Sequence, residues 1–251
     1  MTPLRESGVV RPGWPAPANV RAAVVARTVP GHSAVPFGPM NLGTRCGDAP
    51  EAVAANRASL IAAFDLPAAP RWLRQVHGIA VHDADTPLAA DAEPEADAAI
   101  ARRAGVVLAI LTADCLPVLV CSEDGSAIAA AHAGWRGLAG GVIEATIERL
   151  GVPAGRLLAW LGPAIGARSY EVGEEVRAAF VDADAHAAAA FAPTRVGHWH
   201  CDLYALARLR LAGAGVTRIH GGGFDTFADT RFHSYRRERQ TGRFASLVWR
   251  V

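Results

Sequence analysis

The chain alternates short, almost wholly apolar runs with segments in which apolar residues recur at helical spacing. Short continuous apolar runs are typical of strands that are buried on both faces. The pattern predicts strands over residues 22–25, 71–76, 79–82, 106–111, 116–121, 127–131, 157–161, 216–219 and 245–249. It predicts helices over residues 50–64, 138–150, 174–180 and 203–211, with Asp48 as the N-cap of the first. Without strict alternation of strand and helix, this mixture indicates an α+β fold of mixed β-sheets covered by α-helices.

The whole chain, residues 1–251, is expected to form a single domain, because its composition shows no internal break. Residues 1–20 carry prolines and charges, and we interpret them as a partly irregular N-terminal extension. They lack the apolar core of a signal peptide, and no later segment approaches 18 uncharged apolar residues. The sequence therefore predicts a cytoplasmic protein that does not bind membranes.

The charge balance and the basic residues exclude several kinds of chemistry. The formal net charge is +1, which gives no overall attraction to nucleic acid or to an anionic membrane, so the expected partner is a small molecule. All 25 basic residues are arginine. The absence of lysine excludes Schiff-base catalysis, pyridoxal phosphate anchoring and the P-loop lysine. Arginine remains available to bind phosphate or carboxylate groups.

The cysteines and two histidines raise the question of a metal site. The four cysteines, at irregular spacings, favour free thiols or a metal ligand over a disulfide framework; they are Cys46, Cys115, Cys121 and Cys201. His77, Cys115 and His132 each stand at the end of a predicted buried strand. Imidazole and thiolate are zinc ligands, and three protein ligands leave a fourth position open. Spacing alone leaves two other roles open, Cys115 as a small core residue and His132 as a hydrogen-bonded core histidine.

Asp114 stands between two apolar runs, directly before Cys115. A carboxylate there is costly unless it is paired, so we expect it to meet an arginine, a backbone amide or a ligand histidine. Proton transfer is a second role that the residue type allows.

Several long motifs, in order from about residue 13 to the C-terminus, resemble the YfiH family. Members of that family are variously named polyphenol oxidase or laccase, purine nucleoside phosphorylase and peptidoglycan editing factor. The segments that carry the resemblance are 41–43, 47–48, 56–57, 75–78, 112–118, 131–137, 161–166, 170–173, 234–237 and 241–243.

The resemblance implies a single-domain layered sandwich of mixed β-sheets flanked by α-helices. It also implies a zinc ion held by His77, Cys115 and His132, with copper as the less favoured metal. It also implies phosphorolysis of adenosine, inosine and methylthioadenosine, together with adenosine deamination. The partners would then be a purine nucleoside and phosphate.

Phosphorolysis needs a cationic phosphate pocket, for which the resemblance offers a set of donors: Arg57, Arg136, Arg236, Arg237 and Arg243. Arg136 is our first choice, because it follows a metal ligand by four residues; a surface ion pair is its alternative role. With Asp114 it forms the predicted catalytic pair. Asn41 and Gln75 carry amides suited to ribose or purine, although an Asn near Gly is also a common turn residue. Tyr170 and Tyr235 could stack on substrate or pack in the core.

The sequence departs from the family pattern in two places. Arg27-Thr28 stands where relatives usually read Thr-Arg, and a shift of one residue reverses side-chain facing on a strand. Asp225-Thr226 replaces a Cys-Thr pair, which removes a soft ligand and argues against copper.

Three other functions compete with the phosphorylase interpretation. One is a cysteine hydrolase acting on an amide or a peptidoglycan precursor, with Cys115 as nucleophile and His132 as base. Another is copper-dependent oxidation of phenols, as in laccase. A binding module without catalysis is the third, and the polar breaks at buried strand ends argue against it.

Overall fold

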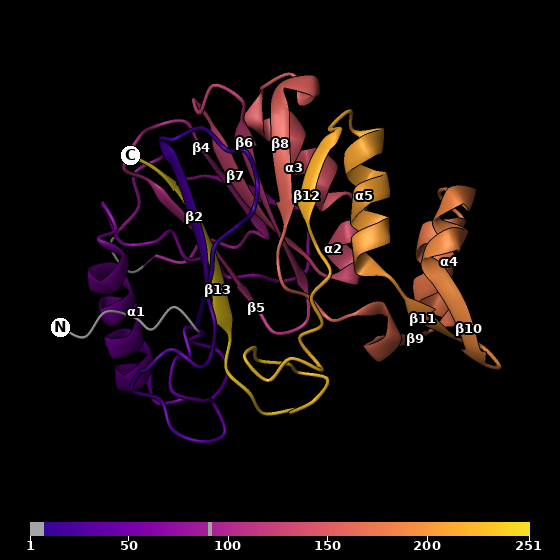
Figure 1. The fold of residues 1–251 in the computed structure, drawn as a ribbon, viewed down its shortest axis with the longest axis horizontal. Coiled ribbons are helices and arrows are strands. Elements are labelled where there is room, and N and C mark those ends of the chain that lie inside the picture. Colours follow the sequence, from indigo (N-terminus) through magenta and orange to yellow (C-terminus); the bar gives the residue numbers. More distant parts are fainter. Residues whose placement is uncertain (1–7, 90–91) are drawn as a thin grey trace.

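A computed structural model describes residues 8–89 and 92–251, in which two β-sheets lie face to face (Figure 1). The first sheet is antiparallel throughout, with strands in the order β1 (Val9–Val10), β2 (Val20–Val25), β13 (Phe244–Arg250) and β5 (Val107–Thr112). The last strand of the chain therefore lies between two strands of its N-terminal half.

The second sheet is mixed, with two parallel outer pairs around three antiparallel pairs. Its strands run in the order β12 (Arg218–Gly221), β8 (Leu157–Leu161), β6 (Leu116–Ser122), β7 (Ile128–Ala133), β4 (Ala98–Ala101) and β3 (Val81–Asp83). The predicted mixed sheet is confirmed.

Helices cover the outer face of each sheet. On the four-stranded sheet lies α1 (Pro50–Phe64), whose Leu60 packs in one buried cluster with Val25 and Leu247. The six-stranded sheet is covered by α2 (Trp135–Gly140), α3 (Val142–Leu150) and α5 (Leu203–Gly213). The layers are therefore helix, sheet, sheet and helix, which confirms the α+β sandwich.

A smaller lobe stands at one end of these layers (Figure 1). It contains α4 (Glu174–Val181) and an antiparallel sheet of β10 (Phe191–Arg195), β11 (His198–Cys201) and β9 (Glu171–Gly173). Short 3-10 helices occur at η2 (Ala154–Arg156), η3 (Ala167–Ser169) and η4 (Ala185–Ala190). The apolar side of α4 packs through Phe180 against Phe191.

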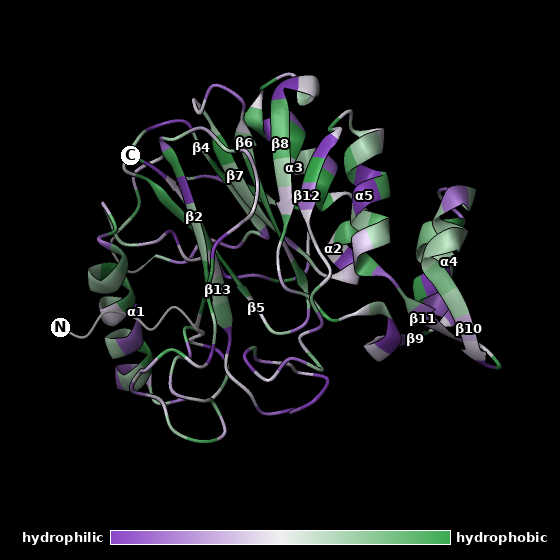
Figure 2. Ribbon diagram, in the orientation of Figure 1, coloured by the Kyte–Doolittle hydropathy of each residue, from purple (hydrophilic) through white to green (hydrophobic). Residues whose placement is uncertain are grey.

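The apolar runs reflect strands that are buried on both sides, as the hydropathy colouring of the central strands shows (Figure 2). Successive side chains of a strand point to opposite faces. In β2, Val24 joins the cluster between the two sheets, and its neighbour Val25 joins the cluster under α1. In β6, Leu119 faces the other sheet and Val120 faces the helices. Continuous hydrophobicity in the sequence therefore marks the middle layers.

Most predicted strands and helices are present, but four predictions need correction. Residues 71–76 form only isolated bridges, at Arg71 and Arg74. The second strand predicted there, 79–82, begins two residues later as β3. The predicted helix 138–150 begins earlier and is two helices, because Gly141 adopts a left-handed conformation at φ 100°. The N-cap of α1 is Ala49 rather than Asp48, although the Asp48 carboxylate accepts a hydrogen bond from the Ala49 N–H.

The structure also has elements that no pattern predicted. They are β1, β4 and the three strands of the small lobe. Among the described residues, no helix has both the length and the hydropathy needed to cross a bilayer. Residues 1–7 of the predicted N-terminal extension lie outside the described residues, and residues 9–10 of the rest form β1.

Candidate metal centre and substrate pocket

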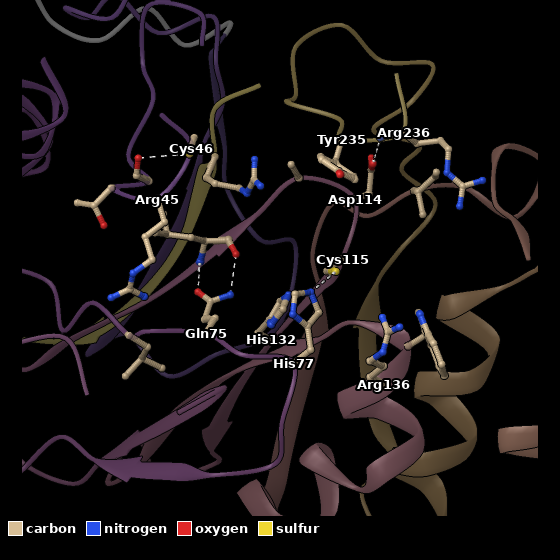
Figure 3. A pocket seen from close by; sticks show the side chains of 18 of the residues that line it. Arg45, Cys46, Gln75, His77, Asp114, Cys115, His132, Arg136, Tyr235 and Arg236 are labelled. Atoms are coloured by element: carbon tan, nitrogen blue, oxygen red, sulfur yellow. Dashed lines mark hydrogen bonds between the residues drawn. The ribbon is translucent and has the colours of Figure 1, made fainter. Parts of the chain in front are cut away.

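The three predicted metal ligands come together from distant parts of the chain. His132 is the penultimate residue of β7, and Cys115 directly precedes β6, the antiparallel neighbour of β7. His77 lies in the bend before β3. One ligand atom from each side chain lies within 4.8 Å of the other two. Figure 3 shows the three side chains gathered at the centre of the pocket.

A buried carboxylate that sequence analysis missed, Asp97, orients two of these ligands. It accepts a hydrogen bond at 2.8 Å from Nδ1 of His132, which leaves the Nε2 lone pair free for a metal. It also accepts three successive backbone N–H groups, from Val76, His77 and Gly78. Asp97 is fully buried, so its charge must be paired by these donors. Burial alone would raise the pKa of Asp97, but His132 and the backbone N–H groups hold it below its ordinary value.

The backbone around the ligands is held in conformations that side chains rarely adopt. His77 has φ 63° and Asp114 has φ 91°. Such strain persists only where the surroundings fix it, and it is concentrated at functional sites. Gly134 leaves room for the ligands, because a Cβ atom there would lie 2.8 Å from Cys115 Sγ and 3.1 Å from His77 Cδ2.

The donor set fits a metal cation. Burial would raise the pKa of the Cys115 thiol, but His132 and His77 outweigh burial and lower the pKa to about 6. A thiolate is the form that binds metal. Cys115 Sγ lies 3.8 Å from His77 Nε2, close to the roughly 3.6 Å expected between sulfur and nitrogen ligands of one tetrahedral zinc ion. The residues present therefore fit a metal ion with an open fourth position.

The ligands line a cavity of about 590 Å³ that opens to solvent. Five arginines line it but only two carboxylates, Glu93 and Asp114, so its lining is cationic; the arginines are Arg45, Arg136, Arg236, Arg239 and Arg243. Apolar side chains complete the wall: Leu73, Leu111, Trp135 and Ile165. In Figure 3, Arg45 and Cys46 lie on one side of the ligands, and Arg136 and Arg236 on the other.

Arg136 and Arg236 are held at the pocket by aromatic rings. The Arg136 guanidinium lies 4.5 Å from the ring centroid of Trp135. That of Arg236 lies 5.2 Å from the ring centroid of Tyr170 and donates to the Glu171 carbonyl at 2.9 Å. Burial raises the pKa of the Tyr170 phenol, as does the Cys115 charge, while Arg236 and Arg136 lower it. Tyr170 lines the pocket beneath the Arg236 guanidinium.

Comparisons with known proteins agree with this architecture. Residues 21–251 match the family described as multi-copper polyphenol oxidoreductase laccase. A purine nucleoside phosphorylase of Pseudomonas aeruginosa is 55% identical, with 95% of this chain and 96% of the relative covered. The Escherichia coli purine nucleoside phosphorylase YfiH is 46% identical, with 98% and 100% covered.

The chain belongs to the YfiH family. Among solved structures, a Neisseria meningitidis protein has a TM-score of 0.92 at 45% identity, with 97% of this chain and 99% of that one covered. YlmD from Geobacillus stearothermophilus has a TM-score of 0.87 at 29% identity, with 97% and 96% covered. The resemblance inferred from the motifs is confirmed.

Not every predicted YfiH site residue reaches the pocket. Asn41 is fully buried, and its amide bonds the backbone of Gly43 and Arg243 and the carboxylate of Asp48. Arg57 lies behind the wall, where it donates to Glu93 and to the Leu42 carbonyl. The structure therefore gives Asn41 and Arg57 supporting roles in the loop next to the pocket, and it does not place them at a substrate.

Other predicted residues lie in or near the pocket but are already bonded. Gln75 spans the backbone of Leu111 with both amide atoms, at 2.8 and 2.9 Å. Arg243 lines the pocket and donates to the carbonyls of Thr241 and Gly242. Arg237 donates to three backbone carbonyls of the 226–232 loop. The amide of Gln75 and the guanidinium of Arg237 therefore hold the pocket's framework together.

Asp114 does not orient a ligand histidine. Its carboxylate accepts hydrogen bonds from the Thr226 hydroxyl and the Arg236 backbone N–H, each at 2.7 Å. The partner of His132 is Asp97 instead. A lone carboxylate inside the apolar run 96–101 was the signal that could have revealed Asp97.

The two departures from the YfiH pattern lie outside the cavity lining. Arg27 pairs with Glu238 at 3.1 Å. Asp225 accepts hydrogen bonds from the Gly166 N–H and the Ser169 hydroxyl, and it supports the loop after β8.

Proposed function

We propose that the chain is a zinc-dependent purine nucleoside phosphorylase that also deaminates adenosine. The observation that carries the proposal is a three-donor metal site with an open position inside a cationic pocket. The names of relatives at 46% and 55% identity support the phosphorylase activity.

Zinc is the metal that the donor set favours. Two imidazoles and one thiolate, with a carboxylate hydrogen-bonded to one imidazole, are typical of catalytic zinc sites. When bound, zinc supplies a positive charge and an open coordination position to a substrate. Asp225 bonds Gly166 and Ser169 in the loop after β8 and offers no soft ligand for copper.

Arg136 and Arg236 would hold phosphate beside the metal ligands. Both are exposed to the cavity and stacked on rings, which leaves guanidinium N–H groups pointing to solvent or ligand. In phosphorolysis a phosphate oxygen bonds to C1′ of the ribose while the C1′–N9 bond breaks and the purine leaves with the electron pair. Fixing phosphate for this in-line exchange is the contribution of the arginines.

The apolar part of the cavity suits the purine. Leu73, Leu111, Trp135 and Ile165 line the cavity. A wall of this kind buries a flat heterocycle, and a few polar groups then set its orientation.

The test is product analysis of purified protein incubated with adenosine, with and without phosphate. We expect adenine and ribose 1-phosphate only when phosphate is present, and inosine in both cases. Metal analysis of the same sample should give about one zinc per chain. Absence of all three products from zinc-loaded protein would contradict the proposal.

A cysteine hydrolase is the second candidate, because Cys115 lies beside His77 and its pKa is lowered to about 6. Such an enzyme would keep its activity on an amide substrate after metal removal. Activity that survives chelation, and is lost on alkylation of Cys115, would favour this candidate over the phosphorylase.

A further inference from the structure

Asp114 joins the metal centre to a loop more than 100 residues away. Its neighbour Cys115 is a metal ligand, and its carboxylate oxygens bond Thr226 and Arg236, one oxygen each. Its own carbonyl accepts the Ile165 N–H at 2.9 Å. Three separate segments therefore meet at this one residue.

The bond from Arg236 begins a chain of contacts that fixes an arginine side chain. Its backbone N–H is held by Asp114, its guanidinium donates to the Glu171 carbonyl, and its charge lies over Tyr170. Thr226, on the other carboxylate oxygen, is fully buried and donates its own N–H to the Ala164 carbonyl. Asp114 thus bonds the buried Thr226 through one carboxylate oxygen and the exposed Arg236 through the other.

We propose that Asp114 is a positioning residue: by holding the Arg236 backbone against Thr226, it fixes the Arg236 guanidinium beside the metal ligands for an anion. That the anion held by Arg236 is phosphate rests on the proposed function. Each of the two carboxylate oxygens of Asp114 accepts a hydrogen bond from a protein donor, which favours positioning over proton transfer.

The left-handed backbone of Asp114 agrees with this role. At φ 91° the backbone of any residue other than glycine is strained, and Asp and Asn are the residues that tolerate such conformations best. The strain aims the carboxylate away from the metal ligands and toward the loop (Figure 3).

The experiment compares Asp114→Ala with Asp114→Asn in the full chain. The alanine variant loses both bonds. The asparagine variant keeps them, because its amide oxygen accepts the Arg236 N–H while its NH₂ group donates to the Thr226 hydroxyl. A matched control is Asp124→Ala, whose carboxylate likewise accepts hydroxyl and backbone N–H groups, from Ser122 and Ser126, in an exposed turn that does not line the cavity.

Two readouts separate positioning from chemistry. Hydrogen exchange of the peptide that contains the Arg236 amide should be about tenfold faster in Asp114→Ala and near the wild-type rate in Asp114→Asn and Asp124→Ala. The KM for phosphate should rise about tenfold in Asp114→Ala, with unchanged zinc content and a smaller change in kcat.

The asparagine variant decides the outcome. If Asp114→Asn is as inactive as Asp114→Ala while the Arg236 amide stays protected, Asp114 transfers a proton and the proposal is overturned. Unchanged exchange in Asp114→Ala would overturn it as well. Because exchange needs no turnover, a wild-type protein without phosphorylase activity would contradict the proposed function and still leave the positioning role tested.

Discussion

The metal end of the pocket is built on a buried histidine and a buried carboxylate at strands of the six-stranded sheet, whereas its arginine end is exposed and built on a short helix and a loop. At the metal end, His132 and Asp97 are almost fully buried, and four hydrogen bonds converge on one carboxylate. At the arginine end, Arg136 and Arg236 are exposed and rest on aromatic rings. A metal needs fixed donors, whereas an anion needs charge that can adjust to it.

The largest effect is expected from Cys115→Ala, which removes one of three ligands at the metal end. Zinc should be lost and kcat/KM for adenosine should fall by about a thousandfold. The strands around the position carry the core, so circular dichroism should show a folded protein. Global unfolding would instead mean that the metal holds the fold together.

Asp97→Ala also disturbs the metal end, because Asp97 holds His132 and the backbone of His77 in place. The variant leaves His132 without its carboxylate and three backbone N–H groups without an acceptor. We expect zinc affinity, measured by competition with a chelator, to fall about 10- to 100-fold. Wild-type affinity in this variant would show that the carboxylate does not organise the site.

Arg136→Ala and Arg236→Ala each remove one positive charge from the arginine end and leave the metal end unchanged. Each should raise the KM for phosphate about tenfold and leave zinc content unchanged, because neither side chain contacts a ligand donor in the structure. Arg239→Ala is the matched control, since Arg239 also lines the cavity and stacks on a ring, that of Tyr235. Equal effects from all three variants would argue for general charge and against a defined phosphate site.

The smallest expected effect is a difference in reactivity between two cysteines that line the pocket, Cys115 and Cys46. The pKa of Cys115 is lowered to about 6, despite burial, by His132 and His77, whereas burial raises the pKa of Cys46. In metal-free protein at pH 7, iodoacetamide should therefore label Cys115 before Cys46. Labelling of Cys115 should fall as the pH drops below about 6, where the thiolate is protonated. Zinc should protect Cys115, and mass spectrometry of the labelled peptides measures each site.

The fold was predictable where burial on both faces leaves a continuous apolar run. Residues 107–112, 116–122 and 157–161 are such strands, and each lies in the middle layers. The strand Ala98–Ala101 was not predicted, because a run of alanines does not distinguish a strand from a helix. The strands of the small lobe were not predicted, because they are short and half exposed.

The site was predictable where strand ends carry metal-binding side chains. Cys115 and His132 fall at such ends, whereas His77 lies in a bend, and the family motifs brought the three together. Bonding partners far along the chain were not predictable, since Asp97 meets His132 and Asp114 meets Thr226 only through the packing of the sheets. For the same reason Asn41 and Gln75 looked available for substrate, although the backbone takes up their amides.

The central claim is that the metal end performs the chemistry and the arginine end binds phosphate. Titration of zinc into metal-free protein, with saturating adenosine and phosphate, tests it most directly. We expect ribose 1-phosphate formation to rise in proportion to zinc up to about one ion per chain, and Cys115→Ala to stay inactive throughout. Full activity without metal, or activity that only copper restores, would contradict it.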